Sequence, residues 1–253
     1  MGRRADVRVW YPALIALTAC AHAAASGDDC LMPLEAPEYK QGTAYELATA
    51  RTLYPRSARL LHLQMTTMPS SEAGGTESAV YLATACPEEG RCRVDQRATV
   101  VGVARAKRSI WAAFEQDSAV PGHRGDPWRA FAWPGLEPAE VELVEAPLSG
   151  AAFAALTAAW ESALQDLCPL IQRDHGPIYG GVKVDGVIYD FTTLGRTGRA
   201  HSPAPGSSAE ALVTLGDQLA ALARSEPKDR PALEAKLIVA AEAVRARFAG
   251  KAP

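Results

Sequence analysis

Two patterns of apolar residues follow each other along the chain, first the alternation typical of strands and then the spacing typical of helices. This order constrains the fold more than any other feature of the sequence. In the first half, apolar and polar residues alternate over residues 61–66, which is typical of a strand with one buried face. His62 lies on the polar side of this alternation, and we expect it at the surface. Strand-like stretches also cover 79–85, 98–104 and 141–145. They predict a strand-rich antiparallel N-terminal half in which 79–85 and 98–104 form a hairpin.

The stretch after these strands repeats its apolar residues at helical spacing. Ser149 stands where a helix N-cap is expected, and Leu148 and Phe153 have the spacing of a hydrophobic staple around it. One apolar stripe then follows, formed by Phe153, Leu156, Trp160, Leu164 and Leu167. We therefore predict a helix that ends near Cys168.

The dipeptide Asp185-Gly186 predicts a β-hairpin. It stands between alternating residues in the stretch 182–189, and a two-residue turn requires positive φ, which Asp-Gly accepts readily. In the predicted register Val184 pairs with Val187, and Asp190 falls on the polar face. The predicted core face consists of Val182, Val184, Val187, Tyr189 and Phe191.

The C-terminal part predicts a pair of helices. Ser207 and Glu210 fit a capping box at the start of the first helix, and Pro227 interrupts the pattern. Pro231 falls in the first turn of the second helix, where a missing N–H is tolerated. Strands, a helix, a hairpin and two helices in this order predict the α+β class, with one domain over residues 38–253.

The N-terminus has the layout of a secretory signal, with basic residues first and a short apolar stretch over 9–17. That stretch is about half of the roughly 20 residues that span a bilayer, so we expect no permanent transmembrane helix. We therefore expect the protein to work outside the cytoplasm.

The residues Leu17-Thr18-Ala19-Cys20 resemble the lipobox of bacterial lipoproteins. The resemblance covers the signal alone and implies cleavage before Cys20. It also implies a lipid on the Cys20 thiol and a fatty acid, such as palmitate, on the new amino group, which together anchor a protein stably. Residues 1–19 would then be the signal peptide and 20–37 a flexible tether. Ala21 points to the outer membrane, facing the periplasm. Ordinary cleavage after Ala23 is the alternative.

Four cysteines remain once Cys20 is lipidated or removed. An even number in an oxidising compartment predicts two disulfides, although three connectivities are possible. We favour Cys86–Cys92, because this short segment joins two strand-like stretches. Cys30–Cys168 follows by elimination and would fasten the end of the tether to the end of a helix, stabilising the fold by about 2–4 kcal/mol. No zinc-binding spacing occurs, so we expect no metal and no cofactor.

The charge of the chain argues against nucleic acid as a partner. The formal net charge is −3, and removal of residues 1–19 makes the mature chain more acidic still. Phosphate backbones require a net basic footprint. The expected partners are the membrane, through the lipid anchor, and an envelope protein.

Two segments contain candidate binding residues. A proline-containing loop over 120–138 carries Trp128, Phe131 and Trp133, which could cover the core or anchor an interface. A basic, glycine-containing segment after the predicted hairpin carries Arg196, Arg199 and His201. It could bind an anion, but we favour a solvated connection in which both arginines are exposed.

The sequence contains no G-x-S-x-G, P-loop, G-x-G-x-x-G or H-E-x-x-H motif, so we assign no catalytic residue. The favoured function is a non-enzymatic envelope lipoprotein that binds a protein or an envelope component. One alternative is an envelope hydrolase with a scattered site, for example one that joins His175 or His201 to a carboxylate and a hydroxyl. Another is an inhibitor of a periplasmic enzyme, with 120–138 as the protruding loop.

Overall fold

The computed structural model describes residues 30–33, 44–53, 60–69, 74–85, 98–113, 140–165, 167–168 and 186–250. The strands are β1 Met32–Pro33, β2 Leu60–Pro69, β3 Ser78–Ala85, β4 Ala98–Ala106, β5 Val141–Pro147, β6 Val187–Thr193 and β7 Arg196–His201. The helices are α1 Ala44–Leu53, α3 Gly150–Gln165, α4 Ser208–Arg224 and α5 Arg230–Ala249. A short helical turn covers 110–113.

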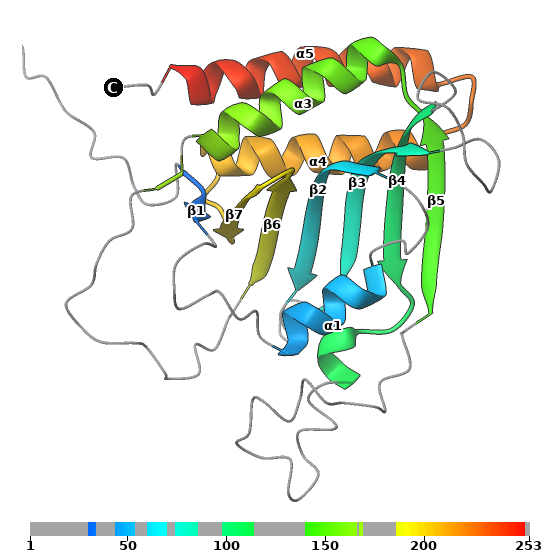
Figure 1. Cartoon of the computed structure of the whole chain (residues 1–253), viewed down its shortest axis with the longest axis vertical. Helices are drawn as coiled ribbons and strands as arrows, with labels where there is room; N and C mark the ends of the chain where they lie inside the picture. Colours follow the sequence, from blue (N-terminus) through cyan, green and yellow to red (C-terminus); the bar gives the residue numbers. More distant parts are fainter. Residues whose placement is uncertain are drawn as a thin grey trace, which may run out of the picture.

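The described strands form one antiparallel sheet in the order β1-β7-β6-β2-β3-β4-β5. Helices cover both of its faces, and in Figure 1 α1 crosses in front of β2, β3 and β4 while α3, α4 and α5 are grouped together. The predicted α+β class is therefore confirmed. The predicted hairpin is also present, since β3 pairs with β4 from Ser78↔Arg105 to Ala85↔Ala98.

The sheet is buried on both faces, and β3 shows how its residues divide between them. Val80 and Leu82 belong to the core beneath α3, α4 and α5. Ala79, Tyr81 and Ala83 belong to a second core with α1 and the turn at 110–113. Full burial of a large apolar side chain contributes about 1.5–3 kcal/mol, so both faces contribute to stability.

The prediction that β2 buries one face only is wrong. Gln64 and Thr66, on its polar side, are each 5% exposed. The second core continues beside them, so these side chains need internal partners. The Gln64 amide donates to the Thr66 hydroxyl at 2.8 Å, as expected of buried polar groups.

The predicted helices form with the predicted signals. The Ser149 hydroxyl accepts from the Ala152 N–H at 3.2 Å at the start of α3, and Trp160 is fully buried. The Ser207 hydroxyl accepts from the Glu210 N–H at 3.1 Å. The Glu210 carboxylate accepts from the N–H of Gly206, one residue before the cap. Pro231 lies in the first turn of α5.

The predicted hairpin around Asp185-Gly186 is wrong in its pairing. β6 pairs with β2 on one edge and with β7 on the other, so neither edge can take the stretch 182–184, which lies outside the described residues. The turn of the hairpin is instead at Leu194-Gly195, between β6 and β7. The predicted face is confirmed for Phe191, which is fully buried in the core beneath α3–α5, and for Tyr189, which packs against that core.

Both the backbone conformation and the surroundings of Gly186 require a residue without a side chain. Its φ is +121°, and a Cβ there would lie 2.0 Å from the Ser202 Oγ. That hydroxyl accepts from the Val187 N–H at 3.1 Å, so the site lacks room for a side chain. Gly195 also has a positive φ of +89°, but a Cβ there would meet nothing within 4 Å.

These two glycines form a matched test. We expect Gly186→Ala to lower the free energy of unfolding by about 2–4 kcal/mol, from backbone strain and steric overlap together. Gly195→Ala should cost about 1–2 kcal/mol, from backbone strain alone. Urea unfolding of the two variants measures the difference. Equal losses would show that Ser202 does not crowd Gly186.

Candidate functional site

The predicted basic segment is a strand, β7, and not a flexible connection. Arg196 begins it and His201 ends it, both exposed. At about 3.3 Å per residue they lie roughly 16 Å apart. Because side chains alternate along a strand, Arg196 and Arg199 point to opposite faces. The structure therefore does not bring Arg196, Arg199 and His201 together at one point.

Arg199 is largely buried, although the sequence led us to expect an exposed side chain. Its Nε donates to Asp190 Oδ1 at 2.7 Å and its Nη2 to Asp190 Oδ2 at 2.8 Å. Nη2 also lies 2.5 Å from the Glu46 carboxylate, and the three side chains are 14–21% exposed. We call Glu46, Asp190 and Arg199 the charge cluster.

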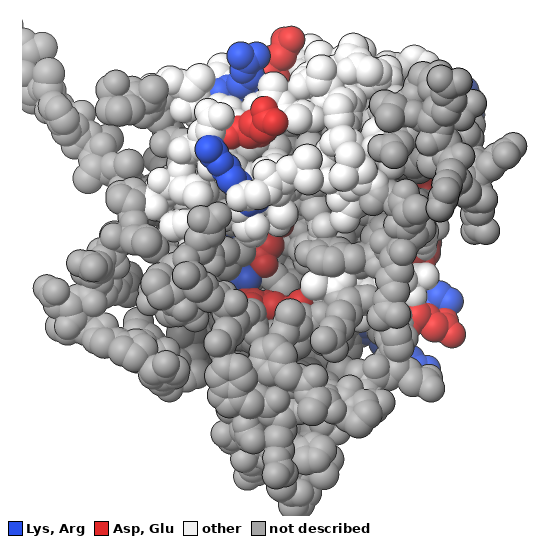
Figure 2. Space-filling model, in the orientation of Figure 1, with Lys and Arg blue, Asp and Glu red and all other residues white. Residues whose placement is uncertain are grey.

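Three elements position the charge cluster. Asp190 on β6 is directly opposite Arg199 on β7, and Glu46 is in the first turn of α1. In Figure 2, acidic and basic side chains lie beside each other where Figure 1 shows α1 near β6. The cluster therefore joins α1 to the strands of the C-terminal half.

Polar side chains extend from the charge cluster across the same face of the sheet. Thr66 is opposite Asp190, and Gln64 is opposite Thr192. The Thr192 hydroxyl donates to the Thr197 hydroxyl at 3.4 Å. This face is thus polar at these positions of β2, β6 and β7, whereas Met68 and Ile188, farther along the same face, belong to the apolar core with α1.

Burial and charge act in opposite directions on the ionisation of the charge cluster. Burial raises the pKa of the Asp190 carboxyl above its ordinary value, while the hydrogen bonds from Arg199 oppose that rise. Burial tends to lower the pKa of Arg199, but the bonds and charge of Asp190 and the charge of Glu46 raise it overall. With its Nε and Nη2 committed to carboxylates, Arg199 acts here as a cross-link between elements.

Glu77 is a second buried charge, which sequence reasoning missed. It is 0% exposed. Its carboxylate accepts from the N–H groups of Ile110 and Trp111, both at 2.8 Å, and from the Tyr45 hydroxyl at 3.0 Å. Burial and then the charge of Glu77 raise the pKa of Tyr45. Glu77 therefore caps the turn at 110–113 and links it to α1, across more than 30 residues that no local motif bridges.

A tyrosine–carboxylate pair crosses the sheet near its other edge. The Tyr81 hydroxyl donates to the Glu145 carboxylate at 2.6 Å, although β4 lies between their strands. The Tyr81 ring passes over Gly102, where a Cβ would lie 2.1 Å from the ring. The absence of a side chain at Gly102 is what allows this contact.

His62 lies partly buried instead of at the surface, because the pairing of β2 with β3 is irregular between Leu61 and Leu63. Its ring packs edge-on against Phe153 with centroids 4.9 Å apart. Its Nε2 is 3.1 Å from the Thr84 hydroxyl. Burial lowers the pKa of His62 below its ordinary value.

The structure places Cys30 and Cys168 in a disulfide, with Cα atoms 5.2 Å apart. The predicted pair is therefore present. Beside it, the Cys168 N–H donates to the Leu31 carbonyl at 2.8 Å, and Leu31 is fully buried. Residues 30–33, which the sequence analysis assigned to the tether, are thus part of the folded domain. Three other predicted site cysteines, Cys20, Cys86 and Cys92, lie outside the described residues.

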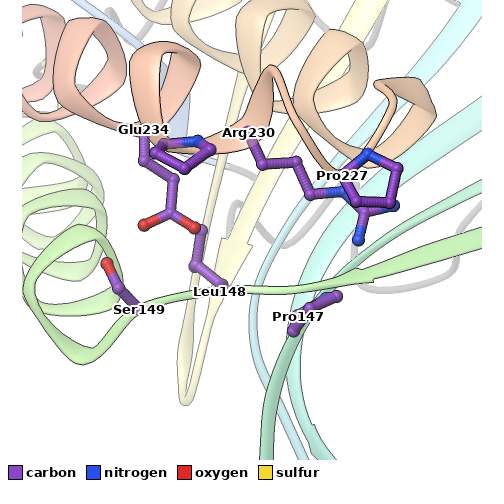
Figure 3. A pocket seen from close by; sticks show the side chains of 7 residues that line it. Pro147, Leu148, Ser149, Pro227, Arg230 and Glu234 are labelled. Carbon is purple, nitrogen blue, oxygen red and sulfur yellow. The ribbon is translucent and has the colours of Figure 1, made fainter.

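A surface cleft of about 510 Å³ lies where the β5–α3 junction meets the α4–α5 connection. Arg230 extends toward Pro147 and Pro227, while Glu234 extends toward Ser149 (Figure 3). An Arg230 Nη2 donates to the Ser225 carbonyl at 3.2 Å. The lining residues are Pro147, Leu148, Ser149, Pro227, Arg230, Pro231 and Glu234. Among the described residues that line the cleft, none is a candidate binding residue from the sequence.

Trp128, Phe131 and Trp133 lie outside the described residues. Within the described ranges, no three His, Cys, Asp or Glu side chains are grouped to hold a metal ion. No helix among those ranges has the length and apolar character needed to cross a membrane.

The charge cluster predicts a contrast between two arginines of β7. Arg199→Met should lower the free energy of unfolding by about 2–4 kcal/mol, because it leaves Asp190 and Glu46 buried without their cation. This figure is reduced for the partial exposure of the cluster. Arg196→Ala, at an exposed position, should change it by less than about 0.5 kcal/mol. Urea unfolding compares the two. A negligible loss in Arg199→Met would contradict the assignment of Arg199 as a cross-link.

The lowered pKa of His62 predicts a loss of stability in mild acid. The unfolded chain binds a proton near pH 6.5, whereas the folded state resists it until a lower pH. The contribution of His62 is thus present above about pH 6.5 and decreases as the pH falls toward the folded-state pKa. His62→Gln should weaken this decrease, as measured by unfolding midpoints at several pH values. An imidazole pKa of 6.5 or higher, measured by NMR in the folded protein, would contradict this prediction.

No family model, no curated protein and no solved structure matches the chain.

Proposed function

We propose that this protein is a non-enzymatic lipoprotein of the bacterial envelope. A lipid on Cys20 holds it to the membrane, and its domain binds a protein or another envelope component. The outer membrane, facing the periplasm, is the proposed location, since Ala21 follows the lipidated residue. Nucleic acid is not among the proposed partners.

The Cys30–Cys168 disulfide is the observation that supports this proposal most strongly. The two cysteines are 138 residues apart in sequence, and the fold brings them together through the docking of residues 30–33 beside the end of α3. Stable disulfides form in oxidising compartments outside the cytoplasm. The pair therefore agrees with an exported chain, as its N-terminal signal indicates.

The buried polar groups support a binding role over a catalytic one. Glu77 caps a helical turn, and Asp190, Arg199 and Glu46 cross-link α1 to the sheet. Stability and local structure account for each of these groups. A domain of this kind is a rigid scaffold that can present loops to a partner.

One contact favours the hydrolase alternative. His62 lies within hydrogen-bonding distance of the Thr84 hydroxyl, and burial lowers the pKa of the imidazole, which favours its neutral form. A base beside a hydroxyl is the first requirement for nucleophilic catalysis. Loss of a measured esterase or amidase activity in Thr84→Val, with the fold intact, would favour this alternative over the binding role.

Substitution at the processing site tests the anchor. We expect Cys20→Ser to stall processing or to release the protein from the membrane fraction, because the thiol that carries the lipid is gone. Ala23→Leu is the matched control. It should leave processing unchanged, although it would block ordinary cleavage after residue 23. Fractionation and mass spectrometry of the N-terminal peptide measure both. Normal processing of Cys20→Ser together with failure of Ala23→Leu would contradict lipidation.

A capture experiment tests the binding role. The intact, lipidated protein is recovered from detergent-solubilised envelope, with Cys20→Ser as the comparison. We expect one envelope component to be recovered in amounts similar to the protein itself. Recovery of no such component after chemical cross-linking in intact cells would contradict a stable binding role.

A further inference from the structure

Residues 30–33, the first described segment of the chain, are fastened to the C-terminal half by several interactions. The disulfide joins Cys30 to Cys168. The Cys168 N–H donates to the Leu31 carbonyl, and β1 pairs with β7 through Met32↔Arg199 and Pro33↔Gly198. All of these attachments are concentrated in four consecutive residues.

Between the described residues, the non-covalent part of this attachment covers a short stretch of chain. β1 contains two residues and lies at the end of the described sheet. Met32 is 48% exposed, whereas Leu31 is fully buried, close to Gly198, where a Cβ would lie 2.9 Å from the Leu31 Cβ. A short edge strand that depends on one buried side chain belongs to the parts of a fold that open most readily.

We propose that the Cys30–Cys168 disulfide is a redox-sensitive lock that holds β1 on the edge of the sheet. With the lock closed, β1 pairs with β7 through Met32 and Pro33. With the lock open, β1 leaves β7, and the backbone of β7 loses its neighbouring strand on that edge. The lock itself does not rest on the proposed lipid anchor.

A dithiol reductant would open the lock by thiol–disulfide exchange. A thiolate of the reductant attacks the sulfur of Cys30 or Cys168, the S–S bond breaks, and the other cysteine leaves as a thiolate that takes a proton from water. The second thiol of the reductant displaces the first cysteine, so the reductant ends as a disulfide and both cysteines as thiols. Both cysteines are half-buried and not fully enclosed, which leaves a reductant access to them.

Hydrogen exchange of the full-length mature protein, followed by mass spectrometry, tests the lock. Dithiothreitol should accelerate exchange in peptides that cover 30–33, 167–168 and 196–201, on the order of tenfold or more. Peptides from 78–85 and 98–106, in β3 and β4, should keep their protection. These strands pair with each other far from β1 in the sheet order.

Two double variants separate this bond from the other cysteines. Cys30→Ser/Cys168→Ser should show the faster exchange at 196–201 without reductant. Cys86→Ser/Cys92→Ser should keep its protection until reductant is added. Unchanged exchange at 196–201 in the first variant overturns the lock. Loss of protection throughout the sheet also overturns it, because the bond would then support the whole fold. If the protein proves not to be anchored through Cys20, the proposed function fails while the exchange results still decide the lock.

Discussion

The pairing of β2 with β6 holds the two halves of the chain in one sheet. It runs from Leu63↔Thr193 to Pro69↔Val187, between residues more than 100 positions apart in sequence. The hairpin of β6 and β7 is placed beside β2 by this pairing, and β1 is added next to β7. The charge cluster and the disulfide both depend on this arrangement, because each joins residues from the two halves of the chain.

Local signals predicted the elements that local interactions form. The Ser149 and Ser207 caps, the stripe around Trp160 and the pairing of β3 with β4 need partners only a few residues away or across a hairpin. The pattern of β6 was recognised correctly, and Phe191 lies in the core as expected. The predicted pairing of β6 with residues 182–184 was wrong. Asp185-Gly186 has the composition of a tight turn, but β6 is already paired on both edges.

The polar face of the sheet could not be predicted from residue spacing. An alternating strand indicates one buried face, but α1 and the turn at 110–113 cover the other face too. This second cover buries Gln64 and Thr66 and places Glu46 beside Arg199. Arg199, in the basic, glycine-containing segment, is thus an internal cross-link, since the carboxylates that neutralise it come from α1 and β6. Buried charges of this kind require partners, and the partners are distant in sequence.

The buried carboxylates beneath the second cover are held in place by other elements. Glu77 and Asp190 accept hydrogen bonds from other elements. These bonds fix the two side chains and stabilise the interior, so a recognition surface for the proposed partner would lie on its outside.

The disulfide joins Cys30, in the first described segment, to Cys168, just beyond the end of α3, and the proposed export would let it form outside the cytoplasm. Peptide mapping of the exported protein without reduction tests this most directly, with thiols alkylated at the moment of cell lysis. The account predicts one linked peptide pair that contains Cys30 and Cys168. Free thiols at both positions, or Cys30 joined to Cys86 or Cys92, would contradict it.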